Sequence, residues 1–231
     1  MNLIKSFRIV LTIFAALISA ARTYAQEPVR DDALTLEMRA GHSAVFEYFT
    51  AASLKTLQTF DDNFLLEAGI RYSSIGKIAL EARPAYLMEM PWGMLSAEAI
   101  LEYTNLKSVN NLAAGAGVGI SGTWIGGRLG YYYRLYGGKG GKIHEPFNIY
   151  YELCANILPM IRYWDLQFAI TNCEMFELER HYQPTFMIEC FHYPMDALGV
   201  SLALGCKPAG IFNMSVGYYQ TFINLGVCYR W

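Results

Sequence analysis

The stretch Asn224–Trp231, NLGVCYRW, ends the chain and is the part of the sequence that decides the fold class. Every second residue in it is apolar, and these residues are Leu225, Val227, Tyr229 and Trp231. The residues between them are small or polar. Successive side chains of a β-strand point to opposite faces, so the pattern predicts a strand with one side toward lipid and one toward a wetter interior.

The same alternation continues upstream, beginning at Leu34. The segment from Phe64 to Tyr72, for example, has apolar residues on one face and Glu67 and Arg71 on the other. Segments with this period of two occur about twelve times, the last of them before the terminal strand being 212–218. The sequence therefore predicts an all-β fold, a closed antiparallel transmembrane β-barrel of about twelve strands, with ten or fourteen as alternatives.

The composition favours the same class of protein. Hydrophobic residues make up 54% of the chain, yet after residue 25 no apolar run is long enough for a transmembrane helix. The 17 Tyr, 13 Phe and 4 Trp residues suit the aromatic girdles of membrane barrels. A soluble β-sandwich or lipocalin-like barrel would also alternate, but it would turn its apolar face inward.

The terminal stretch resembles the C-terminal β-signal of Gram-negative outer-membrane β-barrel proteins, whose last residue is usually Phe rather than Trp. The resemblance extends over Leu34 to Trp231 and points to the porin-like superfamily, with no specific family identified. It implies that outer-membrane lipids surround the barrel and that the barrel-assembly machinery binds the last strand. The residues of the implied assembly signal are Leu225, Val227, Tyr229 and Trp231.

The first 25 residues have the three regions of a secretory signal peptide. Early basic residues precede the apolar run Ile9–Ala21, and small residues at Thr23 and Ala25 predict cleavage after Ala25. An uncleaved anchor is the alternative, but the run is shorter than the roughly 20 residues that a spanning helix needs. We thus expect a signal peptide at 1–25, a short periplasmic segment at 26–33, and an outer-membrane barrel at 34–231.

The expected mature chain is acidic. Removal of Lys5, Arg8 and Arg22 with the signal leaves 15 of the 18 basic residues against 20 acidic ones, a net charge near −5. Binding of nucleic acid requires clustered positive charge, so the charge balance argues against a nucleic-acid partner. The sequence does not determine the oligomeric state.

Charged residues gather on the face of the expected strands that points away from lipid. One interpretation is a structural network of ion pairs across neighbouring strands, and the other is an eyelet that lines an aqueous path. We favour the network, because a barrel of this size need not leave an open pore. The expected lumen-facing residues are Glu37, Arg39, Glu67, Arg71, Glu81, Arg83, Glu98, Glu102, Arg128, Arg134 and Glu152.

The sequence contains no motif for catalysis, a metal or a cofactor, and we expect none of the three. His42 and Ser43 are adjacent, so on a strand they face opposite sides and cannot act together. The remaining candidates for a lipid hydrolase are not grouped: His144, His181 and His192, with Ser121 or Ser201. The five cysteines show no C-x-x-C spacing, and they are Cys154, Cys173, Cys190, Cys206 and Cys228.

Two features of the connections complete these expectations. The residues from Ser43 to Asp62 are expected to form a long extracellular connection. In it, Val45 to Thr59 is a strand extension or an amphipathic helix, whose aromatic residues cover the barrel mouth or touch lipid headgroups. With that assignment, the connections Asn105 to Asn110 and Tyr136 to Phe147 would be periplasmic, although they are long for periplasmic turns.

The leading functional interpretation is porin-like passage of small solutes through a polar, charge-lined lumen. The first alternative is a closed structural or interaction barrel whose loops bind a partner. The second is a barrel lipid hydrolase.

Overall fold

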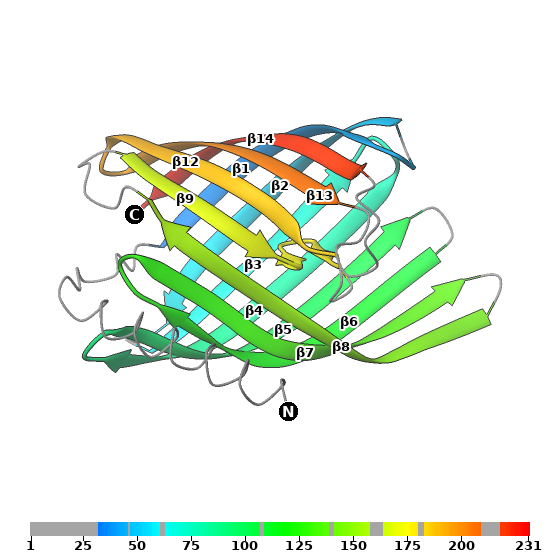
Figure 1. Ribbon diagram of the computed structural model, residues 1–231, viewed down its shortest axis with the longest axis horizontal. Helices are drawn as coiled ribbons and strands as arrows, with labels where there is room; N and C mark the ends of the chain where they lie inside the picture. The colour runs from blue at the N-terminus through cyan, green and yellow to red at the C-terminus, as the bar shows by residue number, and fades with distance from the viewer. Residues whose placement is uncertain are drawn as a thin grey trace, which may run out of the picture.

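The computed structural model describes residues 32–45, 47–60, 63–106, 109–138, 141–157, 164–179, 183–208 and 218–231. Within these ranges, twelve strands form one closed antiparallel barrel, and two further strands form a separate two-stranded sheet (Figure 1). The predicted fold class is therefore confirmed, while the expected signal peptide lies outside the described residues. No helix in the described ranges is long and apolar enough to cross a membrane.

The barrel strands follow one another in sequence around the wall. They are β1 (Ala33–Ser43), β2 (Glu47–Phe60), β3 (Phe64–Ser73), β4 (Lys77–Met90), β5 (Gly93–Leu106), β6 (Val109–Ser121), β7 (Ile125–Gly138), β8 (Gly141–Asn156), β9 (Trp164–Thr171), β12 (Thr185–Met195), β13 (Leu198–Pro208) and β14 (Tyr218–Arg230). The two-stranded sheet consists of β10 (Cys173–Glu174) and β11 (Glu177–Leu178).

The first and last strands close the barrel. β1 pairs with β14 along its whole length, from Ala33 opposite Arg230 to Ser43 opposite Gln220. The backbone N–H of Trp231 donates to the carbonyl of Asp32 at 3.1 Å, so the two ends of the barrel domain lie side by side. We call the end of the barrel that holds Asp32 and Trp231 the terminal end. Neighbouring strands are antiparallel, so successive strands run alternately away from this end and back toward it.

One expected connection is wrong. The residues from Ser43 to Asp62 do not form a loop, because Glu47–Phe60 is the wall strand β2, paired with β1 and β3. Its alternation is blurred in the sequence, since Phe49 is buried on the inner face. An ideal Cβ at Gly41 would lie 2.7 Å from the Phe49 ring. The ring therefore fits only because Gly41 has no side chain.

The expected strands differ from the structure in one place and lie outside the described residues in another. β2 was missing from the expectation, and the expected separate strand 212–218 falls mostly outside the described residues, with Tyr218 already in β14. Adding β2 reverses the assigned ends of the following connections. Those near Asn105 to Asn110 and Tyr136 to Phe147 therefore lie at the end away from the terminal end, and β5 to β8 extend through most of them.

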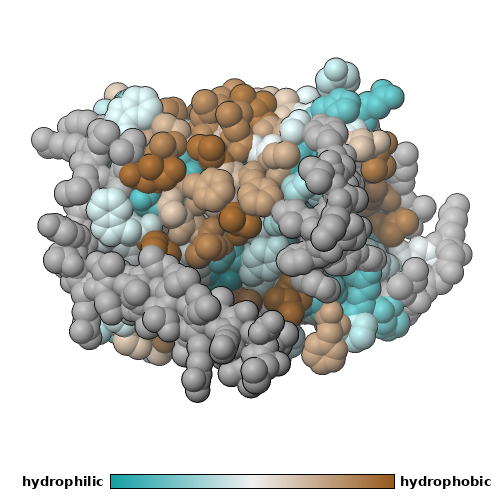
Figure 2. All heavy atoms as spheres, viewed as in Figure 1, coloured by the Kyte–Doolittle hydropathy of each residue, from teal (hydrophilic) through white to brown (hydrophobic). Residues whose placement is uncertain are grey.

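The outer surface of the barrel has the character of a membrane-spanning surface. Its middle exposes aliphatic side chains such as Leu36, Val118 and Leu202, and Figure 2 shows apolar side chains gathered over the middle of one outer face. Exposed aromatic residues mark both rims, a distribution typical of the two interfaces of a bilayer. At the terminal end they are Phe60, Phe64, Tyr86, Trp164, Tyr229 and Trp231, and at the other end Tyr48, Tyr72, Tyr103, Tyr133 and Phe147.

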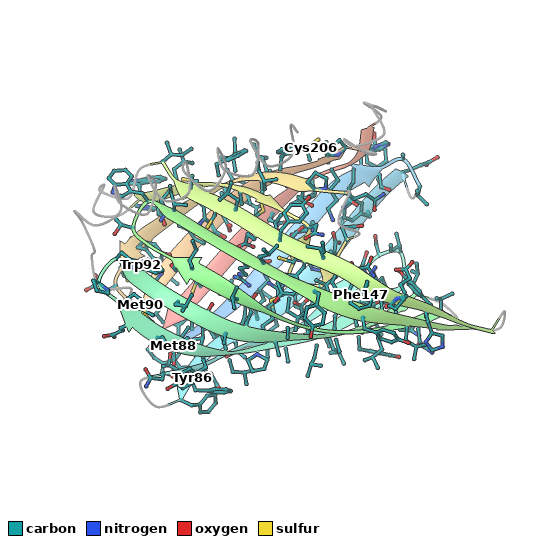
Figure 3. The ribbon with its side chains drawn as sticks, turned by 60° about the horizontal axis from the view of Figure 1, so that its bottom comes forward. Tyr86, Met88, Met90, Trp92, Phe147 and Cys206 are labelled. Carbon is teal, nitrogen blue, oxygen red and sulfur yellow. The ribbon has the colours of Figure 1, made fainter. Side chains whose placement is uncertain are left out.

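The two rims can be followed in Figure 3. Tyr86, Met88, Met90 and Trp92 lie together where β4 turns into β5 at the terminal end. Phe147 lies on β8 toward the opposite rim. Long aromatic and sulfur-containing side chains at these positions suit the boundary between headgroups and acyl chains.

Candidate functional site

The lumen contains a short hairpin, Asn172–Glu179, which we call the lumen hairpin. It follows β9, includes β10 and β11, and is visible in Figure 1 as the small yellow element beyond the end of β9. Its side chains and backbone contact β1, β3, β4, β5, β7 and β13, strands that lie around the whole wall. A single short segment can reach all of them only from inside the barrel.

The lumen hairpin leaves the wall where β9 stops. β9 has eight residues and pairs with β8 only between Glu152 and Asn156 of the longer strand. Asn172 then takes over the next hydrogen bonds of β8: its Oδ1 accepts from the N–H of Tyr151 at 2.7 Å, and its Nδ2 donates to the carbonyl of Ile149 at 2.8 Å. The asparagine thus satisfies backbone groups that a longer β9 would have paired.

Charged wall residues hold the backbone of the lumen hairpin. Arg83 Nη2 donates to the carbonyl of Cys173 at 2.6 Å, and the N–H of Leu178 donates to Glu102 Oε2 at 3.1 Å. Glu81 accepts from the N–H of Phe176, and Arg134 donates to the carbonyl of Leu178. Hydrogen bonds to charged groups are stronger than neutral ones, so these four wall residues fix the height of the hairpin in the lumen.

Other wall residues bind the carboxylates of the lumen hairpin. Arg39 pairs with Glu174 and lies 3.5 Å from Glu177, and Lys207 pairs with Glu177 and lies 3.4 Å from Glu179. Burial alone would raise the pKa of Glu177, but the positive charges of Lys207 and Arg39 outweigh it and hold this pKa well below its usual range. Glu177 is therefore an anion whose charge is balanced by the wall.

The turn of the lumen hairpin is anchored by an aromatic ring. Phe176 is fully buried and has a φ of +71°, in the left-handed region that residues with a side chain rarely adopt. Its ring lies beneath the guanidinium of Arg71, 4.8 Å from the ring centre, and against Gly69. An ideal Cβ at Gly69 would lie 2.7 Å from the ring, so only glycine at this wall position leaves the ring its place.

Six of the eleven charged residues expected in the lumen contact the lumen hairpin, and they are Arg39, Arg71, Glu81, Arg83, Glu102 and Arg134. The others meet wall residues. Glu37 pairs with Lys55 at 2.6 Å, and Arg128 lies 3.9 Å from Glu98 and 3.4 Å from Glu152. Glu67 stands opposite Arg83 in the register of β3 and β4.

The expectation that these charges pair across strands thus holds for part of the lumen only. Sequence reasoning missed the hairpin partners Glu174, Glu177 and Glu179, together with Lys55 and Lys207 of the wall. Lys55 and Lys207 occupy inward positions of β2 and β13, so correct strand boundaries would have identified them. No periodic signal marks the three glutamates, because β10 and β11 have two residues each.

A cavity of about 320 Å³ lies between the lumen hairpin and the rim away from the terminal end. Its charged lining residues are Arg39, Arg71 and Lys77 from the wall, and Glu177 and Glu179 from the hairpin. Polar side chains complete much of the lining, among them Ser43, Ser73, Thr104, Asn111, Tyr136 and Gln220. The cavity offers donors and acceptors for a small polar solute.

The structure does not group the residues weighed for catalysis. His42 pairs with the Tyr48 ring, His144 with Tyr133, and His192 stacks on Trp164 on the outer face. His181 lies outside the described residues. Ser201 is next to Val200, the register partner of His192, and so it faces the opposite side of the wall.

The cysteines form neither a disulfide nor a metal site in the described part of the chain. All five are free thiols, and no group of His, Cys, Asp and Glu side chains among the described residues could hold a metal ion. Burial raises the pKa of Cys173 in the lumen hairpin to about 11. Its thiol therefore stays protonated and a poor nucleophile at neutral pH.

No protein-family model matches the sequence, and no curated protein matches it. Solved structures are similar in fold. The translocator domain of the autotransporter NalP from Neisseria meningitidis has a TM-score of 0.59 at 10% identity, covering 98% of both chains. The KdgM porin, in complex with disordered oligogalacturonate, has a TM-score of 0.56 at 11% identity, covering 86% of this chain and 99% of that one.

A further similar structure is an outer membrane channel from Pseudomonas putida F1, with a TM-score of 0.53 at 13% identity over 90% of this chain and 98% of that chain. At these identities the likeness is one of fold. It agrees with the closed antiparallel barrel described above.

Proposed function

We propose that this protein is an outer-membrane channel for small polar solutes, with the lumen hairpin as its constriction. The observation that carries the proposal is a charged interior beside a polar cavity. Charges in a dry interior are costly, and a filled structural barrel would be served as well by apolar packing. A hydrated path through the lumen removes most of that cost.

The fold of the neighbours supports this proposal, since a porin and an outer-membrane channel share the architecture. The terminal end would face the periplasm, as in barrels whose strand number is even. The lumen hairpin would then enter from the cell surface, and the cavity above it would be the first site that an incoming solute meets.

Single-channel conductance of the refolded chain 26–231 in a planar bilayer tests the proposal. We expect discrete, reproducible steps, and a reversal potential in a salt gradient that changes when Arg128 is replaced by Glu. A heat-unfolded sample provides the control for leaks. If neither the intact protein nor a variant with the hairpin replaced by a Gly-Ser linker conducts, although both are folded, the proposal of a channel is wrong.

That silence would favour the second candidate, a closed barrel whose loops bind a partner. The specific observation in its favour is the complete burial of Cys173 and Phe176 in the lumen hairpin. Conductance separates the two candidates, because only a channel needs a continuous path past the hairpin.

We also propose that the last strand directs assembly. Its outward residues Leu225, Val227, Tyr229 and Trp231 are all exposed on the lipid side, next to the seam between β14 and β1. Removal of Trp231 should lower the yield of heat-resistant, folded protein in the outer membrane while refolding of the purified chain continues. Equal yields in cells would contradict the assembly role.

A further inference from the structure

We infer that the channel selects small cations over anions, and that carboxylates in the terminal half of the lumen set this selectivity. The terminal half is the part of the lumen between the lumen hairpin and the terminal end. This inference rests on the proposed function and deepens it, because it names the charge class of the solutes that would pass.

Strand direction places the carboxylates in the terminal half. β3 begins at the terminal end, so Glu67 lies nearer to that end than Arg71, which contacts the lumen hairpin. β12 runs toward the terminal end from Thr185, the register partner of Thr171, where the lumen hairpin leaves the wall. Glu189 follows Thr185 on β12 and therefore also lies on the terminal side of the hairpin.

The inner face of the terminal half carries more acidic than basic side chains. By strand alternation, seven carboxylates and three bases of the described residues face it, a surplus of four negative charges. The carboxylates are Glu37, Glu67, Glu89, Glu98, Glu152, Asp165 and Glu189, and the bases are Lys55, Arg128 and Arg230. Arg83 is counted with the lumen hairpin that it binds, and counting it here would still leave a surplus of three.

The rest of the lumen is close to neutral. At the lumen hairpin and beyond it, six bases and seven carboxylates of the described residues face the interior. The bases are Arg39, Arg71, Lys77, Arg83, Arg134 and Lys207, and the carboxylates are Glu47, Glu81, Glu102, Glu145, Glu174, Glu177 and Glu179. The net negative charge of the lumen is therefore concentrated on the terminal side of the hairpin.

The charges of the terminal half are also within reach of a passing ion. The side chains of Arg128 and Glu152 are 30% and 20% exposed, whereas those of Arg39 and Lys207 beside the hairpin are each 2% exposed. Charges at the hairpin are thus packed against one another, and charges in the terminal half border open space.

Three partly exposed carboxylates of the terminal half form no ion pair with a base of the described part of the chain, and they are Glu67, Asp165 and Glu189. Glu67 stands opposite Arg83 in the register, but that guanidinium binds Glu81 and the carbonyl of Cys173. Fixed charges act over a Debye length of about 8 Å at physiological ionic strength. In a narrow lumen, a surplus of one sign raises the concentration of counter-ions and excludes ions of the same sign.

Reversal potentials across a planar bilayer that separates two concentrations of potassium chloride test the inference. At pH 8, where the carboxylates are ionised, we expect potassium to be at least about threefold more permeant than chloride. Glu189→Gln should lower this ratio, and the triple variant Glu67→Gln, Asp165→Asn, Glu189→Gln should bring it close to one. Asp196→Asn removes one carboxylate from the exposed turn between β12 and β13 and is the matched control, which should keep the ratio of the intact chain.

The possible outcomes separate this inference from the channel itself. A conducting protein with a ratio of one or less, or an equal fall of the ratio in Asp196→Asn and Glu189→Gln, would overturn the inference while the channel stands. If the intact chain is silent, the variant with the hairpin replaced by a Gly-Ser linker takes its place, and the three replacements should again lower the ratio. Silence from both folded proteins would overturn the channel and this inference with it. If the triple variant does not fold, the three single replacements should each lower the ratio.

Discussion

The two halves of the lumen hold their charges in different ways. Toward the terminal end, ion pairs join neighbouring strands, as when Arg128 meets Glu152 on the adjacent β8 at 3.4 Å. Around the lumen hairpin, wall charges instead bind a segment far away in the sequence: Arg83 and Cys173, which share a 2.6 Å hydrogen bond, are 90 residues apart. The comparison teaches that one half is a fixed wall and the other is a wall plus a separable insert.

The largest effect should come from removing a cation that the lumen hairpin needs. Arg39→Gln leaves Glu174 and Glu177 buried with one positive partner fewer, and breaking a buried pair costs about 3–5 kcal/mol. We expect a loss of that order in the free energy of unfolding, measured by urea titration in detergent. The same loss from Arg128→Gln, in the other half of the lumen, would contradict the distinction between the halves.

A somewhat smaller effect is expected when the seat of the Phe176 ring is filled. Gly69→Val would place atoms against the ring and against the carbonyl of Leu54, 2.6 Å from an ideal Cβ. Overpacking of this kind costs about 1–3 kcal/mol and should lift the hairpin from its seat. Thermal unfolding measures the loss, and Gly137→Ala, where an added Cβ meets nothing within 4 Å, should change nothing.

The hairpin half should also respond to acid. Because the pKa of Glu177 is lower in the folded protein than its usual value of 4.5, this carboxylate stabilises the fold fully above about pH 4.5. That contribution is lost as the pH falls through the lowered pKa. Unfolding of the native protein and of Glu177→Gln should therefore differ at pH 6 and converge in stronger acid, and a constant difference would contradict the role of the charge.

The smallest effect on stability should come from Arg128, whose side chain is 30% exposed. Loss of a pair whose cation is partly solvated should cost less than loss of the fully buried Arg39, although it leaves Glu98 with a side chain that is only 6% exposed. The replacement Arg128→Glu should nevertheless shift the reversal potential toward cation selectivity, because it reverses a charge on the lumen wall. An unchanged potential in a conducting protein would place the path elsewhere.

Much of this architecture follows from local pattern. Alternation around Leu34 and Leu225 predicted outward faces that the structure exposes, and the prediction of a barrel followed from such faces. β2 was missed because Phe49 faces inward, and its place depends on Gly41, a residue of another strand. Alternation along one strand carries no information about a packing contact between residues of two different strands.

The lumen hairpin was beyond prediction for a related reason. Its strands have two residues each, too few for periodicity, and its stability comes from wall residues such as Arg83 and Glu102. The same residues appear in the sequence as ordinary inward charges. Their partners become evident only when the chain after Thr171 is seen to turn into the barrel.

The most direct test of the account compares the conductance of the intact chain with that of a variant in which Cys173–Leu178 is replaced by a Gly-Ser linker of equal length. A control variant carries Gly-Ser at the turn residues Ala44 and Val45, which lie outside the hairpin contacts. If the lumen hairpin is the constriction, its replacement should raise the single-channel conductance severalfold while the control matches the intact chain. Equal conductance in all three folded proteins would contradict the account, because the path would then not pass the hairpin.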